Sequence, residues 1–496
     1  MPDWTSRRCG ETFGSTGGIL IFRFAVLSLF ALAVPAAAQR ATPDSAARWV
    51  DSIFAPFNST RSPGCAVGVV RGGQVALAKG YGMADLEHDT PITNDTRFYI
   101  ASISKQFTAM AIVLLARDGK LSLDDSIRKW VPEVPKFGAG ITLRHLLYHT
   151  SGLRDYFTLL AVSGWPSDGP LTEQQFLTLV GRQRGLNFQP GDEFLYSNTG
   201  YVLLSIVVRR ASGMPLREFA AEQIFKPLGM THTEFRDDHT SLIPQRAVGY
   251  QPIGSTYRLS QPEFDVVGDG GMYSTVEDLV KWDSNFETGW VGGADGIALL
   301  QSPGRLNDGQ PIQYALAQTI GEFHNIKTFS HGGAYGGYRS ALLRFPEKNL
   351  SVITLCNTSA ASATLAEQVG RIFLGIAAER ANVATTVDLS ASLMSFGSAQ
   401  APIDSTGARR RNDRLSLLAG TYYSDELDMT VTVSARDGVL VMSRPRSTEL
   451  RFVPLSDDMF TNSDKMLLRV VQDERGVVTG FALTVNRVRD LAFTKR

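Results

Sequence analysis

Patterns typical of β-strands stand at both ends of a long helix-rich region, and this arrangement constrains the fold more than any other feature. Residues 65–70 and 74–80 are strand-like and are separated by a Gly-Gly turn, which is a hairpin signal. Strand patterns return at residues 328–357, with a hairpin break at residues 346–349. We therefore predict an α+β domain whose antiparallel sheet is assembled from both ends of the region and covered by helices.

The C-terminal part of the chain differs in character. Residues 380–413 are rich in Ala, Ser, Thr and Asp and indicate a linker. Short β segments with turns between them follow from Leu415, which favours a small antiparallel barrel or sandwich. The predicted divisions are a signal peptide (1–38), the α+β domain (42–379), the linker (380–413) and a small β-barrel domain (414–496).

The N-terminus predicts export. Arg7, Arg8 and Arg23 precede an apolar run, residues 24–38, that ends in three alanines. A charged region, an apolar core and a small-residue cleavage site are the parts of a secretory signal peptide, and cleavage leaves Gln39 first. The run is short for a membrane span, although an uncleaved anchor stays an alternative. We expect a bacterial protein located in the periplasm or secreted.

Composition narrows the classes of partner. Of 496 residues, 43% are hydrophobic and 20% charged, which is typical of a soluble globular chain. Lys and Arg together number 49, as do Asp and Glu, so the formal net charge is zero. Without a basic excess, neither nucleic acid nor an anionic membrane surface is an expected partner. The oligomeric state stays open.

Two cysteines remain after the predicted cleavage. Cys65 begins one strand-like segment and Cys356 ends another. If those strands pair antiparallel, the start of one meets the end of the other, so a disulfide is geometrically allowed in an oxidising compartment. Two buried free thiols are the alternative, and the sequence does not decide between them.

Ser102 and Lys105 form a Ser-x-x-Lys motif at the start of an apolar helical pattern that Asp118-Gly119 ends. A serine followed one turn later by a lysine is a known nucleophile and base pair, provided that burial lowers the pKa of the amine. The same spacing recurs at Ser126 and Lys129, in a charged segment where nothing desolvates the lysine. We therefore favour Ser102; the alternative is a helix-capping serine with a surface lysine.

Two later motifs add polar groups. Tyr196-Ser197-Asn198 precedes an apolar helix pattern, and its tyrosine and amide can relay a proton and bind a substrate amide. The segment from His331 to Gly337 contains four glycines, which indicates close approach of the backbone to a ligand. A glycine-rich turn with a surface histidine is the alternative. His145 and His149 have the spacing of a zinc pair but lack the glutamate of that motif, so we expect no metal and no cofactor.

Together and in this order, the three motifs resemble those of the serine β-lactamase and penicillin-binding protein superfamily. The most similar branch is that of class C β-lactamases, D-alanyl-D-alanine carboxypeptidases, D-aminopeptidases and related esterases. Further matches extend from about Ala47 to Ile376; they lie at residues 146–153, 227–230 and 270–275. The resemblance implies an α/β/α sandwich with an antiparallel sheet and a helical subdomain. It also implies a C-terminal small β-barrel of the kind appended to such hydrolases.

The resemblance also implies a role for each motif residue. Ser102 attacks a carbonyl and forms an acyl-enzyme, while Lys105 and Tyr196 share the proton transfers. Substrate-binding residues are Asn198, His331 and Gly333, and the oxyanion hole is formed by the backbone N–H groups of Ser102 and Ala334.

His331 stands where β-lactamases have a lysine, so penicillin hydrolysis is less expected than esterase or D-amino-acid-directed peptidase activity. Arg339 is a candidate for the missing charge, or else a strand residue facing solvent. We predict an exported serine hydrolase that acts on a small-molecule or peptide substrate, with no stable membrane partner. The alternatives are a β-lactamase and a non-catalytic module that binds peptidoglycan or another ligand.

Overall fold

The computed structural model describes residues 43–166, 169–376, 415–445 and 447–496. The predicted signal peptide and linker lie outside these described residues. Within them, we find no helix with the length and apolar character needed to cross a bilayer.

A seven-stranded antiparallel sheet is built from both ends of the first domain, as the strand patterns predicted. Its strands follow the order β10-β11-β12-β13-β14-β1-β2, so the first strand of the chain pairs with β14, the last of this sheet. The predicted break at residues 346–349 is a short 3-10 turn between β13 and β14. The strands are β1 (Cys65–Arg71), β2 (Gln74–Tyr81), β10 (Tyr314–Ala315), β11 (Gln318–Phe323), β12 (Ile326–Tyr335), β13 (Tyr338–Phe345) and β14 (Leu350–Cys356).

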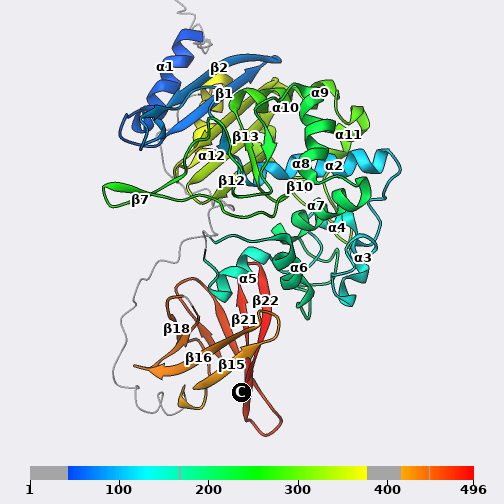
Figure 1. Ribbon diagram of the computed structural model, residues 1–496, viewed down its shortest axis with the longest axis vertical. Coiled ribbons are helices and arrows are strands. Elements are labelled where there is room, and N and C mark those ends of the chain that lie inside the picture. The colour runs from blue at the N-terminus through cyan, green and yellow to red at the C-terminus, as the bar shows by residue number, and fades with distance from the viewer. Residues whose placement is uncertain (1–42, 167–168, 377–414, 446) are drawn as a thin grey trace, which may run out of the picture. The chain divides into compact units, whose positions relative to one another are not determined.

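Helices cover both faces of the central strands β1, β13 and β14, and the residues of these strands are therefore almost all buried. Val67 and Val69 of β1 belong to an apolar cluster with the neighbouring helices α1 (Pro43–Phe54) and α12 (Ser362–Leu374). Ala66 points the other way, into the main core with α2 (Ser104–Arg117) and α10 (Val276–Thr288). The result is a three-layered arrangement of helix, sheet and helix (Figure 1).

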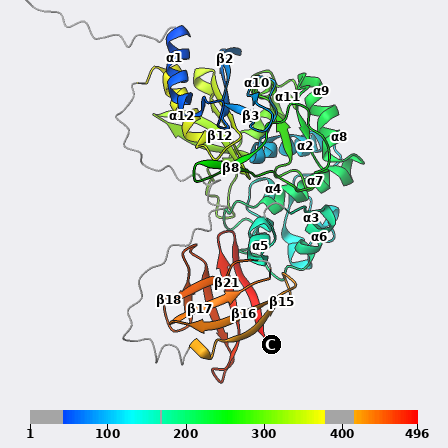
Figure 2. The same cartoon turned by 60° about the vertical axis from the view of Figure 1, so that its left-hand side comes forward.

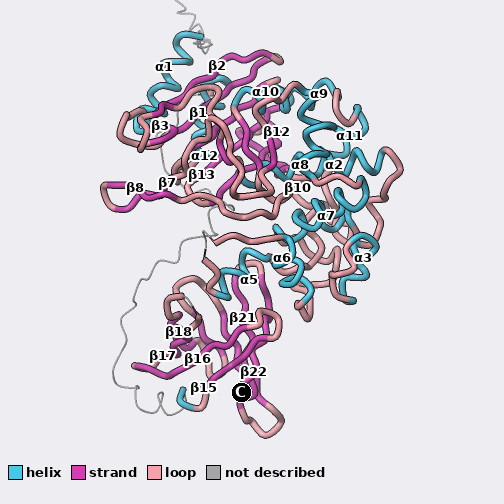
Figure 3. Tube along the Cα trace, in the orientation of Figure 1, coloured by secondary structure: helices cyan, strands magenta, loops and turns pink. Residues whose placement is uncertain are grey.

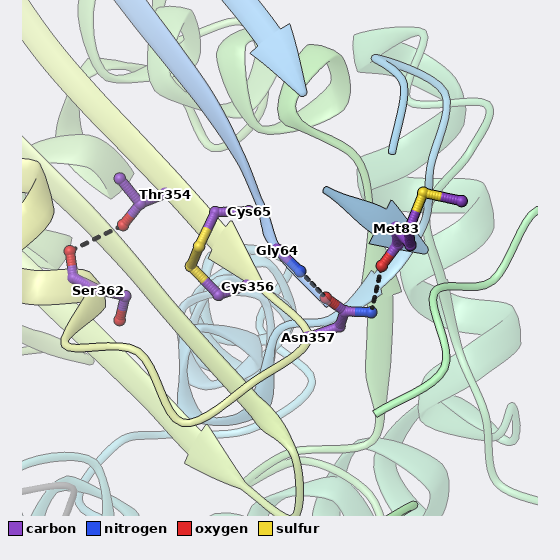
Figure 4. The surroundings of a disulfide bond; sticks show 7 residues. All are labelled: Gly64, Cys65, Met83, Thr354, Cys356, Asn357 and Ser362. Atoms are coloured by element: carbon purple, nitrogen blue, oxygen red, sulfur yellow. Dashed lines mark hydrogen bonds between the residues drawn. A yellow bond between two sulfur atoms is a disulfide. The ribbon is translucent and has the colours of Figure 1, made fainter. Parts of the chain in front are cut away.

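The register of β1 and β14 joins the two cysteines. Cys65 lies directly opposite Cys356, and the two form a disulfide (Figure 4). Beside it, Asn357 accepts a hydrogen bond from the Gly64 N–H at 2.8 Å and donates one to the Met83 carbonyl at 3.0 Å. Of the two alternatives that the sequence left open, the structure has the disulfide.

The remaining helices form the helical part of the domain, around the buried helix α2. Helices α7 and α8 lie beside α2 in both views (Figures 1 and 2). The helices of this part are α3 (Ile127–Trp130), α4 (Leu143–Leu147), α5 (Tyr156–Ser163), α6 (Glu173–Gly181), α7 (Asn198–Ser212), α8 (Leu216–Ala220), α9 (Lys226–Leu228) and α11 (Gly293–Leu300).

Three smaller sheets, two of two strands and one of three, lie outside the main sheet in the described part of this domain. They are β3 (Met83–Asp85) with β4 (Thr90–Pro91), β5 (Phe98–Tyr99) and β6 (Glu234–Phe235) on either side of β9 (Met272–Ser274), and β7 (Tyr250–Ile253) with β8 (Thr256–Leu259). Of these, β5 leads directly into the turn that carries Ser102.

The C-terminal residues form a closed antiparallel barrel, which confirms one of the two expected architectures. Buried and exposed residues alternate along β16, so every second side chain enters the barrel core. Figure 3 shows that strands dominate this region. They are β15 (Gly420–Ser424), β16 (Met429–Arg436), β17 (Val439–Ser443), β18 (Leu450–Pro454), β19 (Met459–Thr461), β20 (Leu467–Gln472), β21 (Val478–Val485) and β22 (Val488–Lys495).

Candidate active site

Ser102 lies in a 3-10 turn, η2 (Ala101–Ile103), immediately before α2. Ala101 has a φ of 47°, a left-handed conformation that is unfavourable for a residue with a Cβ. Tertiary hydrogen bonds hold the residue before it: the Ile100 N–H donates to the Met272 carbonyl at 3.0 Å, and the Ser340 hydroxyl donates to the Ile100 carbonyl at 2.7 Å. The turn thereby keeps Ser102 partly exposed at the start of a buried helix.

Lys105 is fully buried, with 0% of its surface exposed, and its amine has three oxygen neighbours. The Nζ atom lies 3.1 Å from Ser102 Oγ, 2.8 Å from Asn198 Oδ1 and 2.6 Å from the Asp269 carbonyl. The amide of Asn198 is held in this orientation because its Nδ2 donates to Asp155 Oδ2 at 3.0 Å. The structure thus brings together residues from three separate parts of the chain around one amine.

The environment of Lys105 favours an uncharged amine. The pKa of Lys105 is lowered to about 7, chiefly by burial. The charge of Arg487 contributes to this shift, and the carboxylates of Asp269 and Asp155 oppose it. A neutral amine has two N–H bonds and one lone pair. Since Asn198 Oδ1 and the Asp269 carbonyl can only accept, they use both N–H bonds, and the lone pair is left for the hydroxyl of Ser102.

The second Ser-x-x-Lys motif has a purely structural arrangement. Ser126 caps α3 by accepting from the Arg128 N–H, and its hydroxyl donates to the Ala139 carbonyl at 2.9 Å. Lys129 is exposed and pairs with Asp125 at 2.8 Å. This motif therefore provides a helix cap and a surface ion pair, as expected for the match that we did not favour.

Tyr196 lies over the same amine. The Nζ of Lys105 is 4.9 Å from the centre of the Tyr196 ring. Burial raises the pKa of Tyr196, although the Ser102 hydroxyl and the charge of Arg487 oppose the rise. His149 packs against the same ring, with the ring centres 4.1 Å apart. The phenol therefore stays protonated at neutral pH and can donate a hydrogen bond or a proton.

A chain of hydrogen bonds holds His331 as a neutral imidazole. The Ser197 N–H donates to His149 Nδ1 at 3.1 Å, so His149 carries its proton on Nε2 and donates it to Tyr314 at 3.2 Å. Tyr314 in turn donates to His331 Nε2 at 3.0 Å, and His331 Nδ1–H donates to the Gly332 carbonyl at 2.6 Å. Burial, aided by the charge of Lys105, lowers the pKa of His331 to about 4. His331 is buried and uncharged, in contrast to the surface histidine of the alternative.

The glycines that follow His331 serve close packing of the backbone. A Cβ at Gly333 would lie 2.2 Å from the Ile100 carbonyl, so the glycine lets β12 approach the segment that leads into Ser102. Ala334, the next residue, is partly exposed. Arg339 is a residue of β13, and its side chain donates to the carbonyls of Gly336 and Tyr338, at 3.0 and 2.7 Å, next to the turn between β12 and β13.

Three charged residues of this site were not found by sequence reasoning. Asp155 caps α5 and accepts from the Asn198 N–H at 2.7 Å as well as from its side chain. Asp269 receives a hydrogen bond from the Tyr156 hydroxyl at 3.0 Å, and burial raises its pKa to about 6. Arg487 comes from the barrel, with its Cζ 4.6 Å from the centre of the Tyr196 ring. Only Asp269 had a usable signal, namely its place between glycines in the segment from Gly268 to Gly271.

The two histidines with zinc-like spacing have protein partners instead. His145 Nδ1 accepts from the Thr142 N–H at 3.2 Å, and both ring nitrogens of His149 are used in the chain described above. Across the described residues, the one grouping of three potential metal ligands is Asp238, His239 and Asp265, which includes neither.

Comparison with known proteins finds one matching family model and relatives of similar kinds. A family model described as Beta-lactamase matches residues 33–374, which is more than half of the chain. Penicillin-binding protein 4* of Bacillus subtilis is 32% identical over 305 residues, covering 58% of this chain and 66% of that protein. A D-aminopeptidase of Gluconobacter oxydans is 29% identical over 315 residues, covering 63% and 59%. The chain thus spans less than two thirds of the length of these curated relatives.

A solved structure extends the likeness to the barrel. The octameric penicillin-binding protein homologue from Pyrococcus abyssi has a TM-score of 0.58 and 24% identity, and the match covers 91% of this chain and 99% of that one. At this identity the likeness concerns the fold alone. It confirms the predicted fold class, a penicillin-binding-protein-like α+β domain followed by a small antiparallel barrel.

Proposed function

This chain belongs to the Beta-lactamase family, and from that premise we propose that it is a serine hydrolase that cleaves an amide or ester bond through an acyl-enzyme on Ser102. One observation carries the proposal: the buried amine of Lys105 lies 3.1 Å from Ser102 Oγ while its other two neighbours can only accept hydrogen bonds. A base in this position takes the proton of the hydroxyl as it attacks.

The proton transfers follow from the opposite pKa shifts of the two candidate bases. Burial lowers the pKa of Lys105 to about 7 and raises that of Tyr196, so the lysine accepts the Ser102 proton. Ser102 Oγ bonds to the substrate carbonyl carbon, and the backbone N–H groups of Ser102 and Ala334 receive the oxyanion. As the intermediate collapses, the leaving amine or alkoxide takes a proton from Lys105 through Tyr196. Water then cleaves the acyl-enzyme by the same steps in reverse.

Neither Lys105 nor Asp155 uses the second side-chain N–H of Asn198, and we propose that this N–H binds the substrate amide. Its Oδ1 accepts from Lys105 and its Nδ2 donates once, to Asp155. His331 and Gly333 belong to β12, the strand that approaches the segment leading into Ser102, and they complete the proposed set of substrate-binding residues.

We propose a D-amino-acid amide or peptide, or a simple ester, as the substrate, and rank a β-lactam lower. Relatives that carry the name D-aminopeptidase support the first class. The ranking of β-lactams depends on His331, since a neutral imidazole provides no cation for the carboxylate of a penicillin. Turnover of D- and L-aminoacyl nitroanilides, a nitrophenyl ester and a chromogenic cephalosporin separates these classes. Cephalosporin turnover far above the others would reverse the ranking.

Export is part of the proposal. It is supported by the charged and apolar pattern of residues 1–38 and by the Cys65–Cys356 disulfide, which is favoured in an oxidising compartment. The mature N-terminus, measured by mass spectrometry of protein recovered from the periplasm or the medium, should be Gln39. Retention of residues 1–38 on a membrane-bound protein would instead indicate an anchor.

The central test is covalent labelling. A fluorophosphonate probe should add one adduct to the intact mass of the wild type and none to Ser102→Ala. Ser126→Ala is the matched control, because it removes the hydroxyl of the second motif and should be labelled like the wild type. Ligand binding without an adduct or turnover would favour the non-catalytic alternative.

A further inference from the structure

The turn between β21 and β22 of the barrel is bonded to the α+β domain through its backbone. Asn187 Nδ2 donates to the Arg487 carbonyl at 2.9 Å, and the Arg489 N–H donates to Asn187 Oδ1 at 2.8 Å. The Asp155 N–H donates to the same Arg487 carbonyl at 3.3 Å. Because these bonds use the main chain of the barrel, they fix the position of residue 487 whatever its side chain is.

Further contacts anchor the same turn. Arg154 donates to the carbonyls of Arg489 and Asp490, at 2.9 and 3.1 Å, and pairs with Glu426, which is also buried. The guanidinium of Arg489 forms two bonds with Glu193, at 3.0 and 2.9 Å. The start of β22, directly after Arg487, is therefore held to the α+β domain by several contacts.

The side chain of Arg487 points into the candidate active site and is 7% exposed. Its Cζ lies 4.6 Å from the centre of the Tyr196 ring, and its Nη1 lies 4.0 Å from Asp155 Oδ2. That same Asp155 oxygen holds the backbone and side-chain amides of Asn198, which orients Lys105. Arg487 thus lies next to the Tyr196 ring and next to Asp155, the residue that orients Asn198, and both Tyr196 and Asn198 are neighbours of the Lys105 amine.

The third motif, from His331 to Gly337, provides no positive charge next to Tyr196. His331 stands where the resemblance implies a lysine, and its two ring nitrogens are committed to Tyr314 and to the Gly332 carbonyl as a neutral imidazole. A permanent guanidinium charge next to Tyr196 has the effect that a cation in that motif would have: it disfavours a second positive charge on Lys105 and stabilises negative charge on the phenol.

We propose that Arg487, delivered by the C-terminal barrel, is a positioning residue of the acyl-transfer site that keeps Lys105 neutral and Tyr196 oriented, in place of the cation that the third motif lacks. The inference rests on the proposed function of Ser102 and Lys105. It gives the barrel a direct part in the chemistry of the first domain.

The charges that face Arg487 predict the sign of its effect. Arg487 disfavours the positive charge on Lys105 of α2. Asp155 at the start of α5 and Asp269 before β9 are carboxylates that favour this charge. His149 and Tyr314 are uncharged. Burial is the largest cause of the lowered pKa of Lys105, and the charge of Arg487 adds to it. Removing that charge should therefore raise the pKa of the amine, and the acidic limb of the activity profile should move to higher pH.

The test compares full-length variants by the pH dependence of the rate at which a fluorophosphonate probe labels Ser102. Arg487→Met keeps the aliphatic stem over Tyr196 but removes the charge, and we expect its acidic limb to move up by about half a pH unit or more. Arg487→Lys keeps the charge and should restore most of the wild-type profile. Arg451→Met removes one exposed arginine from β18 of the same barrel and should leave the profile unchanged.

The outcomes separate the two proposals. No labelling of the wild type overturns the function assigned to Ser102 itself. Normal labelling with an unmoved acidic limb in Arg487→Met overturns only the role of Arg487, as does equal loss in the Met and Lys variants at every pH, which indicates mere packing. If Arg487→Met does not fold, Asn187→Ala decides, because loosening the turn should move the limb in the same direction and an unmoved limb contradicts the inference.

Discussion

The two Ser-x-x-Lys motifs have the same spacing and opposite surroundings. Lys105 is fully buried beside Ser102, Asn198 and the Asp269 carbonyl, whereas Lys129 is exposed and bound to Asp125. Ser102 stays partly exposed in a strained turn, while Ser126 is used as a helix cap. The shared spacing does not by itself bring the two groups together: the amine of Lys105 lies 3.1 Å from Ser102 Oγ, whereas that of Lys129 is bound to Asp125. The surroundings of Lys105 are what make its amine a candidate base.

The largest difference between the motifs should appear when each lysine is replaced by methionine. We expect Lys105→Met to lower kcat/KM by about a thousand-fold, because the proton of Ser102 loses its acceptor. Lys129→Met should leave kcat/KM unchanged, since it breaks only an exposed ion pair. Steady-state kinetics on the most active substrate of the panel measures both.

Folding must be separated from chemistry in this comparison. Methionine at position 105 leaves Asn198 Oδ1 and the Asp269 carbonyl without their donor, so thermal unfolding and circular dichroism should accompany the kinetics. A folded Lys105→Met protein with wild-type turnover would contradict the assignment of the base.

The pH profile of the wild type is the next test of the contrast. A lysine in water has a pKa of about 10.4 and is a poor base at neutral pH. Burial lowers the pKa of Lys105 to about 7, so kcat/KM should rise about tenfold per pH unit below 7 and level off above it. An acidic limb above pH 9 would mean that the amine behaves like an exposed one.

Much of this arrangement was predictable because its signals are local. The β1–β2 hairpin and the buried helix that follows Ser102 are predicted by strand patterns, a turn and a run of apolar residues. The Cys65–Cys356 disulfide was left open, because its two strands are 291 residues apart and the sequence does not show that they pair. The partners of the amine were not predictable in this way. Asp269 lies 164 residues from Lys105 in sequence, and Arg487 belongs to the barrel, so only the folded chain brings these charges together.

The charge of Asp269 should act on Lys105 in the direction opposite to Arg487. Asp269→Asn removes a carboxylate that raises the pKa of the amine, so the acidic limb should move to lower pH, by about half a unit or more. The backbone carbonyl that accepts from Lys105 is kept, and an asparagine oxygen can still accept from the Tyr156 hydroxyl. The same labelling assay measures the shift, and a limb that moves upward would contradict it.

The smallest effect is expected at the second motif, and it should be one of stability. Ser126→Ala removes a side chain that accepts from the Arg128 N–H and donates to the Ala139 carbonyl. Loss of a helix cap costs about 1 kcal/mol, so the free energy of unfolding should fall by about that amount while kcat/KM stays unchanged.

Ser52→Ala is the control, because Ser52 is exposed inside α1 and its hydroxyl donates to the Arg48 carbonyl one turn earlier. Denaturant unfolding should give little change there, since alanine favours a helix interior. Equal destabilisation by both variants would mean that Ser126 has no special structural role, and a loss of activity in Ser126→Ala would remove the distinction between the two motifs.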